Sequence, residues 1–181
     1  MLFRSEIRAR GDESLVPWDG RTMGELEVRG PWIARAYYNR PDSADRFTDD
    51  GWFRTGDIVT IDKDANIQVQ DRTKDLIKSG GEWISSVALE CALMGHPAVA
   101  EAAVIPVPHP KWDERPLAAV VLKPGQKASP EELRAFLAPS FSKFWLPDAF
   151  EFVDAIPRTS AGKFKKSALR ERFKDYKLAT T

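Results

Sequence analysis

Three polar segments of this 181-residue chain carry residue types that can do chemistry. The first is 53–57, in which Asp57 follows a glycine directly before an apolar run. A carboxylate at such a place can accept hydrogen bonds from two vicinal hydroxyl groups, as on a ribose. Because Gly-Asp is also the composition of a tight turn, this segment alone leaves both interpretations open.

The second segment is 71–82, which places six charged residues among twelve and contains the double glycine Gly80-Gly81. This composition is typical of a solvated face with a flexible loop. The segment by itself therefore predicts exposure and not a particular chemistry.

The third segment is 157–163, a loop of small residues that presents one lysine, Lys163. It differs from a phosphate-binding P-loop in two places. Pro157 stands where the first glycine belongs, and Phe164 stands where a serine or threonine would bind magnesium. The pattern therefore excludes a Walker-type nucleoside triphosphatase.

Two kinds of pattern must position these segments. Up to residue 72 the chain has short alternating runs between turn residues, at 24–30, 58–61 and 67–70, and the last two predict a β-hairpin. From residue 73 helical and strand patterns alternate. We expect strands at 76–78, 99–107, 117–122 and 150–156, and helices at 87–94, 129–136 and 167–176. The sequence thus predicts an α+β fold, with a β-rich part over 1–72 and a compact α+β domain over 73–181.

The composition narrows the classes of protein. The 27 basic and 27 acidic residues cancel, which argues against a dedicated nucleic-acid binder or a cationic membrane-surface protein. No segment approaches the ~18 apolar residues of a membrane span, and we expect neither a span nor a leader peptide. The single cysteine, Cys91, cannot form an internal disulfide. We expect its side chain on the apolar side of its helix, within the protein core. No His/Cys cluster offers a metal site, so we expect no metal ligands. Because no internal disulfide can form, we expect a reducing, cytoplasmic setting.

In their order along the chain, these segments resemble the closing third of the acyl-adenylate-forming family, the AMP-dependent synthetases and ligases. The matching stretches are Gly24–Pro31, Tyr37–Pro41, Arg54–Asp57, Asp71–Gly81 and Pro157–Lys163. Residues 80–86 and 109–116 are most similar to medium- and long-chain fatty-acyl-CoA synthetases. The sequence departs from the commoner family pattern at Phe53, in place of tyrosine, and at Asp71, in place of glycine.

The resemblance implies a two-step reaction, in which a carboxylic acid and ATP give an acyl-adenylate and pyrophosphate, and the thiol of coenzyme A then displaces AMP. ATP and coenzyme A are accordingly expected as substrates, with magnesium accompanying ATP and held by ligands outside this chain. Bringing a carboxylate to a triphosphate opposes negative charges, so a cation directed at both stabilises the transition state. The resemblance gives that role to Lys163, gives the ribose hydroxyls to Asp57, and gives a second ribose or phosphate contact to Arg72. A local Asp57–Arg72 salt bridge is the alternative interpretation.

The resemblance also implies a large movement between the two steps. Lys74 matches the hinge about which the small domain rotates. Lys78 and the Gly80-Gly81 backbone would then replace Lys163 at the reacting centre, and 80–83, including Glu82 and Trp83, would bind coenzyme A. Core packing is the alternative role of Trp83.

Full-length family members begin with a large domain that holds a phosphate loop, an acyl pocket and an acidic magnesium ligand, and this chain contains none of these. The simplest interpretation is a C-terminal fragment of a fatty-acid–CoA ligase, inactive alone, whose partner is the missing large N-terminal domain of the same enzyme. Two alternatives stay open. The chain is either a standalone nucleotide-binding, coenzyme-A-binding or interaction module, or the mobile lid of a ligase for another carboxylic acid.

Overall fold

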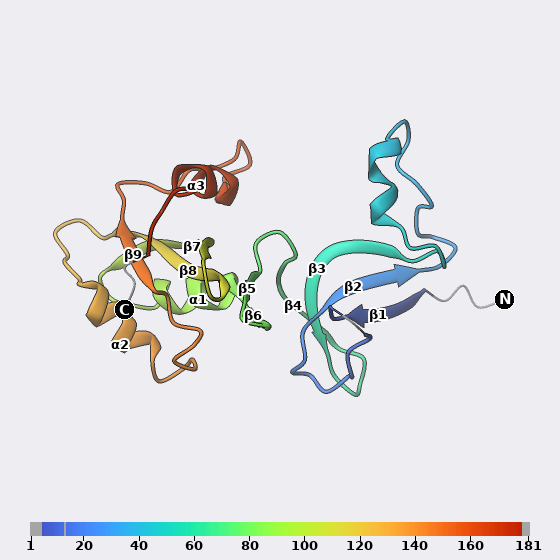
Figure 1. Ribbon diagram of the computed structural model, residues 1–181, viewed down its shortest axis with the longest axis horizontal. Coiled ribbons are helices and arrows are strands. Elements are labelled where there is room, and N and C mark those ends of the chain that lie inside the picture. Colours follow the sequence, from blue (N-terminus) through green and yellow to red (C-terminus); the bar gives the residue numbers. More distant parts are fainter. Residues whose placement is uncertain (1–4, 13, 179–181) are drawn as a thin grey trace. The chain divides into compact units, whose positions relative to one another are not determined.

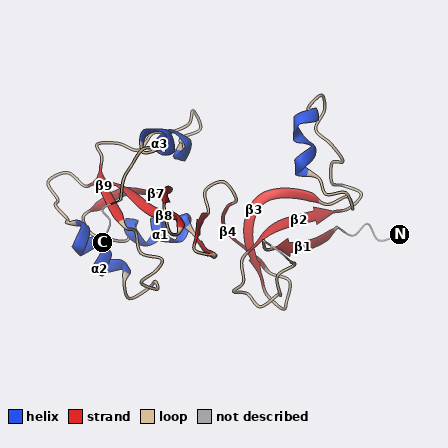
Figure 2. Cartoon of the chain, in the orientation of Figure 1, coloured by secondary structure: helices blue, strands red, loops and turns tan. Residues whose placement is uncertain are grey.

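The computed structural model describes residues 5–12 and 14–178. The chain divides into two compact units, 1–74 and 75–181, which are described separately (Figure 1). Residues 1–4, part of the segment in which we expected no leader, lie outside the described residues. The mixture of strands and helices is the α+β fold class that the sequence predicts (Figure 2).

The first unit is built on a four-stranded antiparallel sheet in the order β1-β2-β3-β4. Its strands are β1 (Glu6–Arg10), β2 (Gly24–Arg29), β3 (Phe53–Ile61) and β4 (Ile67–Arg72), and the 3-10 helix η1 (Pro41–Arg46) lies between β2 and β3. The predicted hairpin is confirmed, because β3 pairs with β4. Its turn is closed by the Asp62 carboxylate, which accepts hydrogen bonds from the backbone of Asp64 and Asn66.

The first unit buries a charged side chain of β2 beside its apolar core. A small apolar core forms around Ala9, Val59 and Ile61. The fully buried residue of β2, however, is Glu27. Its carboxylate is surrounded by arginines, with a nitrogen of Arg10 at 3.2 Å. Burial of this charge is tolerated because it is paired and hydrogen-bonded.

The second unit holds a five-stranded sheet in the order β6-β5-β8-β7, to which β9 adds a parallel pairing with β8. The strands are β5 (Ile77–Ser79), β6 (Glu82–Ile84), β7 (Val99–His109), β8 (Asp113–Leu122) and β9 (Ala149–Phe152). The helices are α1 (Ser86–Met94), α2 (Pro130–Leu137) and α3 (Lys166–Arg172). The predicted α2 signature is confirmed, since the Ser129 hydroxyl and the Glu132 carboxylate form a reciprocal capping box.

Both faces of this sheet are covered, as the alternation along β7 requires. Ala102 and Val104 lie in the apolar cluster under α1 and α2. Ala103 and Ile105 lie in a second cluster, with Leu169 of α3. Figure 1 shows α3 on one side of the sheet and α1 and α2 on the other. The sheet is therefore a rigid central layer that carries loops at its ends.

Three expectations need correction. The strand expected at 150–156 ends at Phe152, and Ile156 is instead buried beside α3. The helix expected at 167–176 ends at Arg172, and the chain then turns so that the Tyr176 hydroxyl donates to Glu151 at 2.7 Å. Cys91 is exposed, because α1 buries Leu89, Glu90 and Leu93 on the opposite side.

Candidate functional site

Asp57 and Arg72 meet across the β3–β4 pair. The two residues are directly opposite in the register, and Arg72 Nε lies 2.8 Å from Asp57 Oδ1. The Asp57 side chain is 30% exposed and that of Arg72 is 59% exposed. An accessible pair of this kind contributes only about 0–1 kcal/mol to stability. The pair therefore has the accessibility that a ligand's hydroxyl or phosphate groups need, as well as the local salt bridge.

The strand that carries Asp57 is shaped by the preceding glycine. Gly56 has a φ of +76°, and its N–H donates to the Glu25 carboxylate at 3.2 Å. Its carbonyl accepts from the N–H of Thr73 at 2.9 Å. These bonds fix the backbone directly before Asp57 and hold the end of β4 beside it. Lys74, the expected hinge, follows directly as the last residue of the first unit and is exposed.

In the second unit, Gly80-Gly81 forms the two-residue turn of the β5–β6 hairpin, because Ser79 pairs with Glu82. Both glycines have positive φ, +53° and +85°, which matches the turn that a two-residue hairpin favours. A Cβ atom on Gly80 would lie 2.7 Å from Trp112 Cε3, whereas one on Gly81 would meet nothing within 4 Å. Gly80 is thus needed for packing, and Gly81 borders open space.

The other residues expected at this loop lie on the same hairpin. Lys78 is exposed, and its ammonium lies 5.0 Å from the centre of the Trp83 ring. The Lys78 N–H donates to the Glu114 carboxylate at 2.9 Å. Glu82 is exposed and accepts from the indole N–H of Trp145 at 3.3 Å. The hairpin therefore brings Lys78, the glycine turn, Glu82 and Trp83 together as one surface.

Lys163 lies on a separate loop of the second unit, directly before α3. Its backbone is fixed to Thr159, since the Lys163 carbonyl accepts from the Thr159 N–H at 2.8 Å. Its side chain is exposed and makes no ion pair or hydrogen bond with any residue in the described part of the chain. A fixed backbone with an unpaired ammonium is the arrangement that a positively charged catalytic group requires.

Sequence reasoning missed the residues that hold these two loops. Arg115 is 4% exposed and forms a two-pronged ion pair with Asp148, at 2.8 and 2.9 Å. It also donates to the Ser79 hydroxyl at 3.2 Å, next to the glycine turn. The one sequence signal for Arg115 is its place in the 109–116 segment. That segment indicates similarity to fatty-acyl-CoA synthetases and predicts no structural role.

The Lys163 loop has its own anchors. Arg158 donates to the Gly162 carbonyl and lies 2.6 Å from the Glu101 carboxylate of β7. After the loop, the ammonium of Lys166, whose side chain is only 10% exposed, lies 2.6 Å from the buried Glu90 carboxylate of α1. No sequence pattern marked these pairs, because the partners are 57 and 76 residues apart in the chain.

The described residues offer no metal site and no membrane-spanning helix. No group of three or more His, Cys, Asp or Glu side chains that can hold a metal ion occurs among residues 5–12 and 14–178. In the same residues, no helix is both long and apolar enough to cross a membrane.

The chain is similar in sequence to proteins of known type. Residues 88–163 match the AMP-binding enzyme C-terminal domain family. The chain is 58% identical, over 89% of its length, to a long-chain-fatty-acid–CoA ligase of Thermus thermophilus, and 41% identical, over 97%, to a medium-chain-fatty-acid–CoA ligase of Ectopseudomonas oleovorans. It spans about 30% of the length of these relatives.

Solved structures give the same result for the fold. A crystal structure of ATP-bound MatB from Rhodopseudomonas palustris superimposes with a TM-score of 0.83 at 33% identity, over 96% of this chain and 35% of that one. The o-succinylbenzoate-CoA synthetase of Bacillus subtilis, in complex with its acyl-adenylate, gives 0.79 at 33% identity, over 99% and 36%. By sequence and fold, the chain corresponds to the C-terminal part of acyl-adenylate-forming enzymes, and its residues 88–163 belong to the AMP-binding enzyme C-terminal domain family.

Proposed function

We propose that this chain is the C-terminal part of an AMP-forming fatty-acid–CoA ligase. In this proposal the first compact unit, 1–74, closes the large adenylating domain and the second, 75–181, forms the mobile domain, so the expected boundary moves from residue 72 to residue 74. The observation that carries the proposal is the Lys163 loop, whose backbone is fixed and whose ammonium is exposed and unpaired within the described residues. The similarity to fatty-acid–CoA ligases over nearly the whole chain supports the reaction type.

The proposed first step joins the fatty acid to ATP. Lys163 directs its positive charge at the carboxylate and the α-phosphate as they approach, and so lowers the cost of bringing two anions together. Asp57 accepts hydrogen bonds from the ribose hydroxyls, and Arg72 contacts ribose or phosphate. Magnesium is expected with ATP, but the described residues offer no cluster to hold it, so no step is assigned to it.

The proposed second step uses the other loop of the second unit. Rotation about Lys74 removes Lys163 from the reacting centre and brings in the β5–β6 hairpin. The open side of Gly81 then allows the pantetheine arm to approach the backbone, and Lys78, Gly80, Glu82 and Trp83 line its path. The ligase reaction is expected only together with the large N-terminal domain. We place the protein in the cytoplasm, since its single cysteine is exposed and fits a reducing compartment.

A second candidate concerns the acid. The chain is 48% identical, over 91% of its length, to a 3-methylmercaptopropionyl-CoA ligase of Ruegeria pomeroyi. A lid for a shorter carboxylic acid therefore has support of the same kind. A standalone binding module has no observation in its favour beyond the accessible Asp57–Arg72 pair.

The test is ATP–pyrophosphate exchange with acids of several lengths, on the chain alone and mixed with the large domain of the Thermus ligase. We expect exchange only in the mixture, and the preferred acid decides between the two candidates. Lys163→Ala should abolish exchange but spare thioester formation from supplied acyl-adenylate. Lys127→Ala, which removes an exposed lysine elsewhere in the second unit, is the matched control. Equal loss of both half-reactions in Lys163→Ala would overturn the proposed role.

A further inference from the structure

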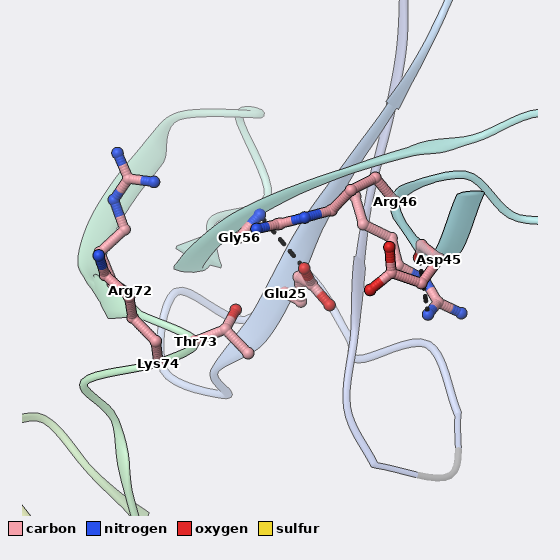
Figure 3. A pocket seen from close by; sticks show the side chains of 8 residues that line it. Glu25, Asp45, Arg46, Gly56, Arg72, Thr73 and Lys74 are labelled. Atoms are coloured by element: carbon pink, nitrogen blue, oxygen red, sulfur yellow. Dashed lines mark hydrogen bonds between the residues drawn. The ribbon is translucent and has the colours of Figure 1, made fainter. Parts of the chain in front are cut away.

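The first unit contains a charged pocket to which the proposed reaction assigns no ligand, although two residues of its lining, Arg72 and Lys74, have roles in that reaction. Its volume is about 350 Å³, and all its lining residues lie within 1–74 (Figure 3). They come from β2, η1, β3 and the end of β4: Glu25, Asp45, Arg46, Arg54, Gly56, Arg72, Thr73 and Lys74. Four cations against two carboxylates give the lining a positive balance. Such a concave, positively charged surface favours an anionic ligand.

Some of these charges already have partners. The Gly56 N–H donates to Glu25 at 3.2 Å. Arg54 donates to the Asp45 carbonyl at 3.5 Å and lies 3.6 Å from the buried Glu27 carboxylate. Arg72 is paired with Asp57. These charged groups of the lining therefore already have partners within the first unit.

Two cations of the pocket have no such partner among the described residues. The side chains of Arg46 and Lys74 make no ion pair or hydrogen bond with any residue that the structure describes. Figure 3 shows the Arg46 guanidinium extending to Gly56, and a Cβ atom there would lie only 3.0 Å from Arg46 Nη1. The absence of a side chain on Gly56 thus gives the guanidinium its place in the pocket. A guanidinium with unused donors matches the oxygens of a phosphate group, and an ammonium adds a point charge.

We propose that this pocket binds a phosphate-type oxyanion, held by Arg46 and Lys74 with Arg72 at its edge. The Asp45 carboxylate, which has no partner among the described residues, and the Glu25 carboxylate select against a bare divalent anion that cannot donate a hydrogen bond. The favoured species is therefore a protonated phosphate or pyrophosphate, whose hydroxyl can donate to a carboxylate.

The site differs from the proposed nucleotide contact. Asp57 does not line this pocket, and Arg46 has no part in the proposed reaction. Thr73 and Lys74 are the last residues of the first unit, so a bound oxyanion would fasten the chain at the start of the second unit. If the proposed function holds, the pyrophosphate released in the first step is a ligand of this class beside the hinge. The binding itself does not depend on that function.

The experiment titrates inorganic pyrophosphate, and separately inorganic phosphate, into the isotopically labelled full chain at constant ionic strength. We expect saturable shifts of the Gly56, Thr73 and Lys74 amide signals. Arg46→Gln and Lys74→Gln should each weaken binding about tenfold, the usual effect of losing one charged hydrogen bond. Lys63→Gln, which removes an exposed lysine from the β3–β4 turn, should leave it unchanged.

Three results would overturn the proposal. One is a response that does not saturate, and another is equal weakening by Lys63→Gln, since either indicates general charge attraction. The third is equal weakening by Asp57→Asn, which would assign the anion to the proposed nucleotide site. If Arg46→Gln alters the whole spectrum, Lys74→Gln decides the matter, because Lys74 is exposed. Failure of ligation in the mixed assay would leave these titrations unaffected, so the two proposals are tested separately.

Discussion

Replacing Gly80 by alanine tests the geometry of the β5–β6 turn. Gly80 and Gly81 share a backbone that disfavours side chains, with φ of +53° and +85°. They differ in the space around them, because only the Gly80 position is occupied, by the ring of Trp112 at 2.7 and 3.2 Å. The two neighbours therefore separate the cost of the backbone from the cost of crowding.

The expected magnitudes follow from these two terms. A left-handed conformation costs a residue with a Cβ atom about 1–2 kcal/mol. Crowding against a packed ring adds about 1–3 kcal/mol, because Trp112 must shift as a rigid body. We expect Gly81→Ala to lower the free energy of unfolding of the second unit by about 1–2 kcal/mol, and Gly80→Ala by roughly twice that.

The assay is urea unfolding of the full chain, followed through amide signals of β7 and β8 so that the second unit is observed directly. A double-mutant cycle with Trp112→Ala should recover the crowding share as a coupling free energy of about 1–3 kcal/mol. Equal losses for the two glycine variants, or a coupling of zero, would refute the assignment of Trp112 as the group that requires Gly80.

Three further outcomes are expected. Lys166→Met leaves the buried Glu90 carboxylate without its cation and should lower the free energy of unfolding by about 3 kcal/mol in the same urea assay; a loss below 1 kcal/mol would contradict this. Ser129→Ala removes one side of a capping box and should cost about 1 kcal/mol, whereas Ser129→Asn should cost much less. The hydrogen bond to the Glu151 carboxylate raises the pKa of Tyr176 from 10.0 to about 12. Its stabilising effect is present below pH 10 and lost between pH 10 and 12, so ultraviolet titration should show one phenol ionising late, and earlier in Glu151→Gln; no difference between the two proteins would exclude the bond.

The elements with local signals could be predicted from the sequence. The α2 capping box lies within four consecutive residues, and the β3–β4 turn is closed by Asp62 within its own loop. The ends of β9 and α3 could not be predicted, because tertiary packing decides them. Ile156 is buried beside α3 without forming a strand, and Tyr176 leaves the helix to reach Glu151.

The predicted hairpin brings Asp57 and Arg72 close together, and a register shift between Ile58 and Val59 then places them directly opposite each other, whereas the anchors of the two loops have no such local signal. Arg115 reaches Ser79 from 36 residues away, and Lys166 reaches Glu90 from 76. A salt bridge across a sheet has no period or spacing that a sequence shows, and charged residues in a polar segment are most simply assigned to solvent. The residues that position a site are therefore the ones for which coordinates are needed.

These anchors also give a physical reason why the second unit can carry the two loops that the proposed reaction uses in turn. Arg115 ties the β5–β6 turn to the segment at Asp148, and the Glu90–Lys166 pair ties the end of the Lys163 loop to α1. Each anchor contains a buried charged group, Arg115 in the first and Glu90 in the second, and breaking either pair would leave that group without its counter-ion away from water. Each loop therefore keeps its own shape when the unit moves as a whole. In the proposed reaction, a rotation about Lys74 would then need to change only the orientation of the unit, and not its internal structure, to exchange one loop for the other.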